Sequence, residues 1–129
     1  MSNKISYSAV VLDKKEQDLL FNKFKTLIPD GWEYIGHHMT IKLGELPEKL
    51  KSLNGKIITL KIKGIGLSDR AMALMVDDSE SISERPIPHI TIAINKNNGA
   101  KPKDSNDIKE WKDLKFPFSV TGTIMEIPF

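Results

Sequence analysis

The sequence predicts a single α+β domain, spanning residues 1–129 and built mainly on antiparallel sheet. Two observations predict this class. One strand and one helix open the chain, and almost every later segment has the pattern of a strand, an order that is typical of α+β domains. The length of 129 residues fits one domain, with one core large enough to be stable without disulfides or metals.

The first strand and the only long helix are predicted from the N-terminal quarter. Residues Ile5–Leu12 mix β-branched, aromatic and small side chains, as strands do. Asp13 followed by Glu16 is a helix-capping signature, in which Asp13 accepts from the first turn and Glu16 reaches back. The apolar positions at helical spacing are Leu20, Phe24, Leu27 and Ile28. The sequence Pro-Asp-Gly at 29–31 then ends the helix.

The rest of the chain is predicted to be strands joined by polar connections. Strands are expected at residues 32–35, 37–43, 57–67, 71–76, 88–95 and 116–127. In the longest internal strand, Lys61 and Lys63 share one face while Ile58, Leu60 and Ile62 share the other. The run 71–76 is continuously apolar, as in a strand buried on both faces. One helical turn is expected within 47–53, polar loops at 77–85 and 97–105, and a short helix at 108–114.

The composition excludes several classes of protein. The chain has no cysteine, which rules out disulfides and thiolate chemistry and suits a reducing compartment. No signal-peptide core and no membrane-length apolar segment is present, so a cytoplasmic location without membrane contact is predicted. The net charge of +2 is too small to predict nucleic-acid binding by itself.

The chemistry is predicted from a duplicated motif. His38-Met39-Thr40-Ile41 and His89-Ile90-Thr91-Ile92 both read His-x-Thr-aliphatic, 51 positions apart, and involve two of only three histidines. A chance match of this kind is on the order of one in a few hundred for ordinary composition. In each predicted strand, the histidine and threonine share a face while the aliphatic residues face the opposite side.

Paired histidines and threonines suit cleavage of a phosphodiester. One group must remove a proton and another must supply one to the leaving oxygen, and imidazoles titrate near neutrality. The hydroxyls of Thr40 and Thr91 are donors for the non-bridging phosphate oxygens. We therefore predict His38, His89, Thr40 and Thr91 as the catalytic set. A zinc site made from His37, His38 and His89 is disfavoured, because adjacent strand residues diverge.

The two motifs resemble the signature of the 2H phosphoesterase superfamily, also called LigT-like. This resemblance implies two lobes of antiparallel sheet around a central cleft, one motif in each lobe, and activity without a metal cofactor. The segment Trp32 to Ile41 looks most like the phage "Swiss-army-knife RNA repair-like" branch, which is similar to phage anti-CBASS nucleases. That implies a cyclic nucleotide or RNA substrate and, for a phage protein, the host cytoplasm. The sequence differs from the pattern of the superfamily in one respect: residues 97–105 are predicted as a loop, so no long helix is expected in the second lobe.

Other residues carry alternative interpretations. Tyr7 has two interpretations. The resemblance implies that it places its aromatic ring against a base; alternatively, it only packs against neighbouring side chains. Lys42 is predicted on the same strand face as His38 and Thr40. It either helps to attract the phosphate or is an ordinary surface lysine. His37 is expected on the opposite face as a packing residue. We expect Trp32 and Tyr34 in the core, Trp111 as a helix anchor, and Glu126 at a sheet edge or orienting a catalytic group.

Three functional hypotheses follow. The first is hydrolysis of a 3′–5′ phosphodiester in a cyclic di- or trinucleotide or a short RNA, through a 2′,3′-cyclic phosphate. The second is an RNA-repair enzyme that opens terminal 2′,3′-cyclic phosphates. The third is a sponge that binds cyclic nucleotides without turnover. No obligate protein partner is predicted, and the sequence leaves open which histidine acts as acid or base.

Overall fold

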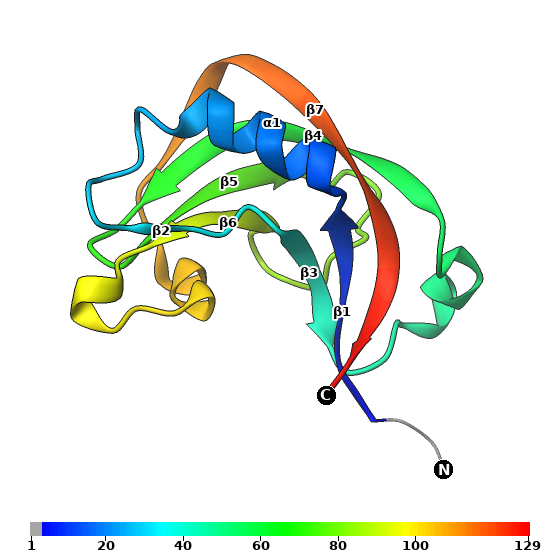
Figure 1. Cartoon of the computed structure of the whole chain (residues 1–129). Coiled ribbons are helices and arrows are strands. Elements are labelled where there is room, and N and C mark those ends of the chain that lie inside the picture. The colour runs from blue at the N-terminus through cyan, green and yellow to red at the C-terminus, as the bar shows by residue number, and fades with distance from the viewer. Residues whose placement is uncertain (1–3) are drawn as a thin grey trace.

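A strongly curved antiparallel sheet and one α-helix form the framework of the computed structural model, which describes residues 4–129 (Figure 1). The strands are β1 (Ile5–Leu12), β2 (Glu33–Tyr34), β3 (His38–Leu43), β4 (Ile57–Leu67), β5 (Ala71–Asp77), β6 (His89–Ile94) and β7 (Trp111–Pro128). The helices are α1 (Lys14–Phe24) and the 3₁₀ helices η1 (Glu48–Leu53), η2 (Lys96–Asn98) and η3 (Pro102–Asp107). The strand-rich α+β prediction is confirmed.

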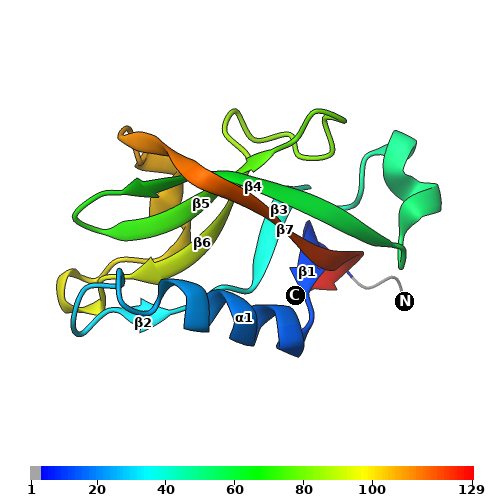
Figure 2. The same ribbon diagram turned by 90° about the horizontal axis from the view of Figure 1, so that it is seen from above.

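The sheet closes on itself as a barrel. The strand order is β2-β6-β3-β1-β7-β4-β5, and β5 also pairs with β6. The long strand β7 bridges the two halves, since it pairs with β1 near its C-terminal end and with β4 along most of its length. The two halves therefore meet twice, at β7–β4 on one side and at β3–β6 on the other. Figure 2 shows β4 and β7 running together over the top of the molecule.

The chain begins and ends on neighbouring strands. Ile5 of β1 pairs with Pro128 of β7, and these two strands lie side by side in Figure 1. This arrangement leaves β1 between β7 and β3, so the first half of the barrel is assembled from both ends of the sequence.

Helix α1 starts where the sequence predicts and ends earlier. The Asp13 carboxylate accepts from the Glu16 amide at 2.9 Å, which confirms this cap. The expectation that Glu16 reaches back to Asp13 is wrong, because its Oε1 accepts instead from the amide and hydroxyl of Thr121 on β7, at 2.9 and 2.8 Å. Leu20 and Phe24 are buried, whereas Leu27 lies beyond the helix end and is 57% exposed.

Two predictions for the C-terminal third are wrong. The segment expected as a loop at 97–105 contains most of the two 3₁₀ helices η2 and η3. The helix expected at 108–114 does not form, because β7 already begins at Trp111, which pairs with Gly66 of β4. Backbone pairing across the sheet therefore outweighs the local pattern that suggested a helix.

The predicted strand faces are observed. Leu60 and Ile62 of β4 are buried while Lys61 and Lys63 are exposed, and Ala71 to Leu74 of β5 are almost fully buried. The main core also contains Leu20 and Phe24 of α1. The helical turn expected within 47–53 forms as η1. No helix in residues 4–129 is both long and apolar enough to cross a membrane.

Candidate active site

The two His-x-Thr motifs meet where β3 pairs with β6. A single residue pair, Met39 with Ile90, joins these strands within residues 4–129, and both side chains are fully buried. Because side chains alternate along a strand, the flanking histidines and threonines face the opposite side. Continuing the antiparallel register from this pair places His38 across from Thr91 and Thr40 across from His89.

A cavity of about 230 Å³ opens on that face. Its lining contains five of the six residues that the sequence singled out, namely Tyr7, His38, Thr40, His89 and Thr91. The remaining lining residues are Leu43, Arg85, Pro102, Lys103 and Asn106. The convergence of both motifs on one cavity is the geometry that acid–base chemistry on a shared phosphate requires.

Lys42 does not line this cavity. Simple alternation places it beside His38 and Thr40, but an irregularity in the β1–β3 pairing intervenes. Ala9 pairs with Thr40, but its neighbour Ser8 pairs with Lys42, so β3 has one extra residue between these two pairs. Lys42 therefore lies on the same face as the buried Ser8 and not on the face of Thr40. Leu43, opposite Tyr7, lines the cavity instead. The prediction of a phosphate-attracting role for Lys42 therefore loses its geometric basis.

The segment before β3 is fixed against β6 and α1. The amides of Ile35 and Gly36 donate to the carbonyls of Ile92 and Thr91, at 2.6 and 3.0 Å. The Tyr34 hydroxyl donates to the Gln17 carbonyl at 2.6 Å, and its ring fills the place where any side chain at Gly36 would stand. With its positive φ of 49°, Gly36 is the residue type that this turn requires.

The imidazoles of His38 and His89 each have a partner at Nδ1. His89 Nδ1 lies 2.7 Å from the Ile87 carbonyl, and since a carbonyl only accepts, this nitrogen carries the proton. His38 Nδ1 lies 2.9 Å from His37 Nδ1, so one of these two nitrogens donates to the other. The expectation that His37 points away is wrong, because His37 precedes β3 and is outside the strand alternation.

Both imidazoles are neutral at neutral pH. Burial lowers the pKa of His38 to about 4, and the nearby imidazoles of His37 and His89 act in the same direction. Burial also lowers the pKa of His89; the Ile87 carbonyl opposes this shift and Arg85 reinforces it. Partial burial raises the pKa of the Tyr7 hydroxyl.

The two threonines differ in their contacts. The Thr91 hydroxyl donates to the Pro102 carbonyl at 3.2 Å and lies 2.8 Å from the buried Ser105 hydroxyl. Within residues 4–129, the Thr40 side chain shows no hydrogen bond, and its hydroxyl is free to donate to a bound anion. The prediction of a direct phosphate donor therefore fits Thr40, while the contacts of Thr91 hold η3 against β6.

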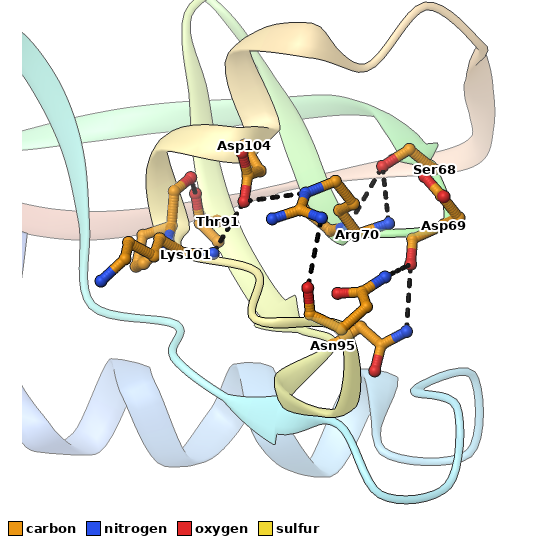
Figure 3. A network of polar contacts seen from close by, with 10 residues as sticks. Ser68, Asp69, Arg70, Thr91, Asn95, Lys101 and Asp104 are labelled. Atoms are coloured by element: carbon orange, nitrogen blue, oxygen red, sulfur yellow. Dashed lines mark hydrogen bonds and ion pairs between the residues drawn. The ribbon is translucent and has the colours of Figure 1, made fainter.

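Helix η3 is also anchored by polar contacts of Asp104, outside the lining of the cavity. Figure 3 shows the network: the Asp104 carboxylate accepts from the Lys101 amide at 2.7 Å and pairs with the Arg70 guanidinium at 3.2 Å. Arg70 also donates to the Asn98 carbonyl at 3.3 Å. These contacts hold in place the segment that carries Lys103 and Asn106 into the cavity lining.

The cavity favours anions. Arg85 and Lys103 line it, no aspartate or glutamate does so, and neither cation forms an ion pair within residues 4–129. Neither residue is predicted as part of the site from the sequence alone. Arg85 lies in a polar loop and Lys103 in a segment rich in Lys, Asn and Pro, and the only available signal was their nearness to the second motif.

The remaining candidates lie elsewhere. Glu126 fits neither interpretation, since its carboxylate accepts from the Leu46 amide at 3.0 Å and pairs with Lys51. Trp32 and Tyr34 pack partly buried against the main core, as expected. Trp111 belongs to β7 rather than to a helix. Residues 4–129 contain no cluster of three or more His, Cys, Asp or Glu side chains suited to holding a metal ion.

The family model and the fold together identify a phosphodiesterase of the 2H phosphoesterase superfamily. The chain belongs to the family described as the fungal tRNA ligase phosphodiesterase domain, whose model matches residues 19–127. Among solved structures, the chain is similar to Escherichia coli LigT, described in complex with NADP⁺. That match has 13% identity and a TM-score of 0.51, and covers 99% of this chain and 96% of that one, so it shows the shared two-lobed fold. No curated protein matches the sequence.

Proposed function

We propose that this protein cleaves a nucleotide 3′–5′ phosphodiester by general acid–base catalysis, with His38 and His89 acting on opposite sides of one phosphate. The observation that carries the proposal is the shared cavity, in which both imidazoles stand beside two cations and no carboxylate. A bound phosphate is an anion that these cations attract. The substrate class is a cyclic oligonucleotide or a short RNA.

The contacts at Nδ1 favour His38 as the first base. When His38 donates from Nδ1 to His37, its Nε2 is left as an unprotonated acceptor. Its pKa of about 4 keeps this nitrogen free of a proton at neutral pH. His38 then removes the proton of the ribose 2′-hydroxyl, and O2′ attacks the adjacent phosphorus.

The contacts of His89 favour the role of acid. The Ile87 carbonyl accepts from Nδ1 and raises the pKa of His89 against the effect of burial. A phosphate bound nearby also opposes the lowering of this pKa, because an opposite charge stabilises the imidazolium. His89 then donates from Nε2 to the departing O5′ as the P–O5′ bond breaks. The product is a 2′,3′-cyclic phosphate, which water opens with the two roles exchanged.

Thr40 and the cations support the phosphate in this scheme. The free hydroxyl of Thr40 donates to a non-bridging oxygen, and Arg85 and Lys103 neutralise charge that grows in the transition state. Thr91 acts through η3, which carries Lys103. The side chain of Tyr7, whose ring centroid lies 5.1 Å from that of His38, offers a face for a base.

A repair activity is the second candidate, favoured by the family to which the chain belongs. That family is named for a phosphodiesterase domain of fungal tRNA ligases, and opening a terminal 2′,3′-cyclic phosphate is the second half of the chemistry described above. The same residues serve both reactions, so the substrate decides between them. The first candidate includes a phage role against cyclic oligonucleotide signals. In that role, the diester that is cleaved belongs to a cyclic di- or trinucleotide.

The test is a substrate panel followed chromatographically in excess chelator. The panel contains cyclic di- and trinucleotides, short RNAs with 3′-hydroxyl ends, and 2′,3′-cyclic mononucleotides. Cleavage of intact diesters that is lost in both His38→Ala and His89→Ala supports the first candidate. Opening of the 2′,3′-cyclic compounds alone supports repair. Tight binding with all ligands unchanged indicates a sponge and contradicts both catalytic candidates. Circular dichroism of the variants checks that they fold.

A further inference from the structure

A second cavity adjoins the first at His89. Its volume is about 200 Å³, and Arg85, His89 and Asn106 line both cavities. The two cavities are therefore adjacent, and a ligand whose phosphate lies between the two histidines has this second space next to it. No aspartate or glutamate is among its lining residues.

The walls of the second cavity are mostly apolar. Pro86, Ile87, Ile108 and Trp111 form the apolar part, and Ser105 lines the cavity together with the three residues shared with the first. The Trp111 ring centroid lies 6.2 Å from that of His89, with 44° between the ring planes. Its Nε1 donates to the Ile108 carbonyl at 3.1 Å, so the polar edge of the indole is already satisfied and its orientation is fixed.

Small residues beneath Trp111 let it lie against the sheet. Trp111 pairs with Gly66 of β4, and a Cβ atom at Gly66 would stand 2.5 Å from the indole Cε3. Ala71 and Ala73 of β5 form the rest of this small cluster with Ile108. Any larger residue at Gly66 would push the ring outward, so this position keeps the indole in a defined place beside the cavity.

The site is therefore flanked by two aromatic rings. Tyr7 stands next to His38 and Trp111 stands next to His89, and the two come from different strands. An aromatic face with apolar walls suits a nucleobase, because every base has a π-face that stacks. A single nucleoside next to the phosphate needs only one such face.

We infer that the Trp111 cavity binds the base of a second nucleoside, on the opposite side of the scissile phosphate from the base at Tyr7. This inference rests on the proposed function and narrows its substrate class. The preferred substrate carries a nucleoside on both sides of the reacting phosphate, as in an internal diester of RNA or of a cyclic oligonucleotide. A 2′,3′-cyclic mononucleotide fills only the Tyr7 side.

The first test reads the fluorescence of Trp111 directly. The chain has two tryptophans, so Trp32→Phe leaves Trp111 as the single reporter, and a further His38→Ala change prevents turnover. Titration with the dinucleotide ApA is expected to quench this fluorescence saturably, while inorganic phosphate and 2′,3′-cyclic AMP leave it unchanged. The inference is overturned when ApA binds, as measured by calorimetry, without quenching, or when 2′,3′-cyclic AMP quenches equally.

The second test separates the two nucleosides kinetically. In Trp111→Leu, kcat/KM for ApA is expected to fall about 10- to 100-fold, the usual cost of losing one stacked base. The ratio of kcat/KM for ApA to that for 2′,3′-cyclic AMP falls with it, and Trp111→Phe restores most of this ratio. Trp32→Phe is the matched control. An unchanged ratio in folded Trp111→Leu contradicts the inference.

The two proposals fail in different ways. When ApA quenches Trp111 but no panel compound is turned over, the cavity binds a base and the catalytic proposal is wrong. When the panel compounds are cleaved but Trp111→Leu retains the wild-type selectivity, the catalytic proposal stands and the second base site is wrong.

Discussion

Met39 of β3 pairs with Ile90 of β6, and this pair is the point about which the two His-x-Thr motifs are arranged. Both side chains are fully buried, so they fix the register while their neighbours face the cavity. A shift of one residue would exchange the two faces and replace two imidazoles and two hydroxyls with apolar side chains. The reciprocal placement of His38 opposite Thr91 and Thr40 opposite His89 follows from this single pairing.

Acid should destabilise the protein through His38. Its pKa of about 4 in the folded state lies below the ordinary value of about 6.5 expected in the unfolded chain. The unfolded state therefore binds the proton first, so stability decreases as the pH falls from 6.5 to 4 and this effect levels off below 4. The full contribution is about 3 kcal/mol. Urea unfolding at several pH values measures it, and His38→Gln should lose most of the dependence; an equally steep loss in that variant would contradict the assignment.

Removal of His37 should raise the pKa of His38. The imidazole of His37 is one cause of the low value, and it also fixes the His38 ring through the contact between their Nδ1 atoms. In His37→Asn, NMR titration of the imidazole resonances should place the His38 pKa higher than in the wild type. The pH at which activity declines on the acidic side should move in the same direction. A His38 pKa that stays the same or decreases would show that His37 has no such influence.

A substrate with an activated leaving group should show which histidine is the acid and which is the base. A nucleoside 3′-(p-nitrophenyl phosphate) releases a stable phenolate that needs little protonation. His89→Ala should therefore regain much of its activity on this substrate relative to a natural diester, whereas His38→Ala should remain inactive on both. The release of nitrophenolate is followed by absorbance. The reverse pattern would exchange the two roles.

Thr40→Val and Thr91→Val should affect different properties, the first mainly kcat and the second mainly stability and KM. Loss of a phosphate donor at Thr40 should lower kcat about 100-fold with little change in stability. Loss of the Thr91 contacts with Pro102 and Ser105 should lower stability by about 1 kcal/mol and raise KM, since η3 carries Lys103. Kinetics and thermal unfolding distinguish these effects, with the exposed Thr59→Val as control. Equal kcat losses at unchanged stability would mean that both hydroxyls contact the phosphate.

Local patterns predicted most of the framework and the central residues of the site. The bounds of β1 and β4 match the prediction, because their alternation and composition agree with their place in the sheet. The His-x-Thr motifs were identifiable because both halves of the site repeat the same short pattern. In these places local preference and tertiary structure coincide.

The errors came from contacts between distant segments. Lys42 was misplaced because the irregularity opposite Ser8 is a property of strand pairing and leaves no signal in the sequence of β3. Arg85 and Lys103 reach the cavity through loops, whose course depends on long-range bonds such as that between Arg70 and Asp104. Trp111 was assigned to a helix because its pairing with Gly66 spans 45 positions.

The most direct test of the central claim is a crystal structure of the protein with adenosine 3′-monophosphate, the product expected when water opens the 2′,3′-cyclic phosphate with the two histidine roles exchanged. The predicted result is one phosphate within hydrogen-bond distance of both imidazoles and of the Thr40 hydroxyl, with the base against Tyr7. A phosphate that contacts only one histidine, or that binds outside the cavity shared by the two motifs, would contradict paired catalysis by His38 and His89.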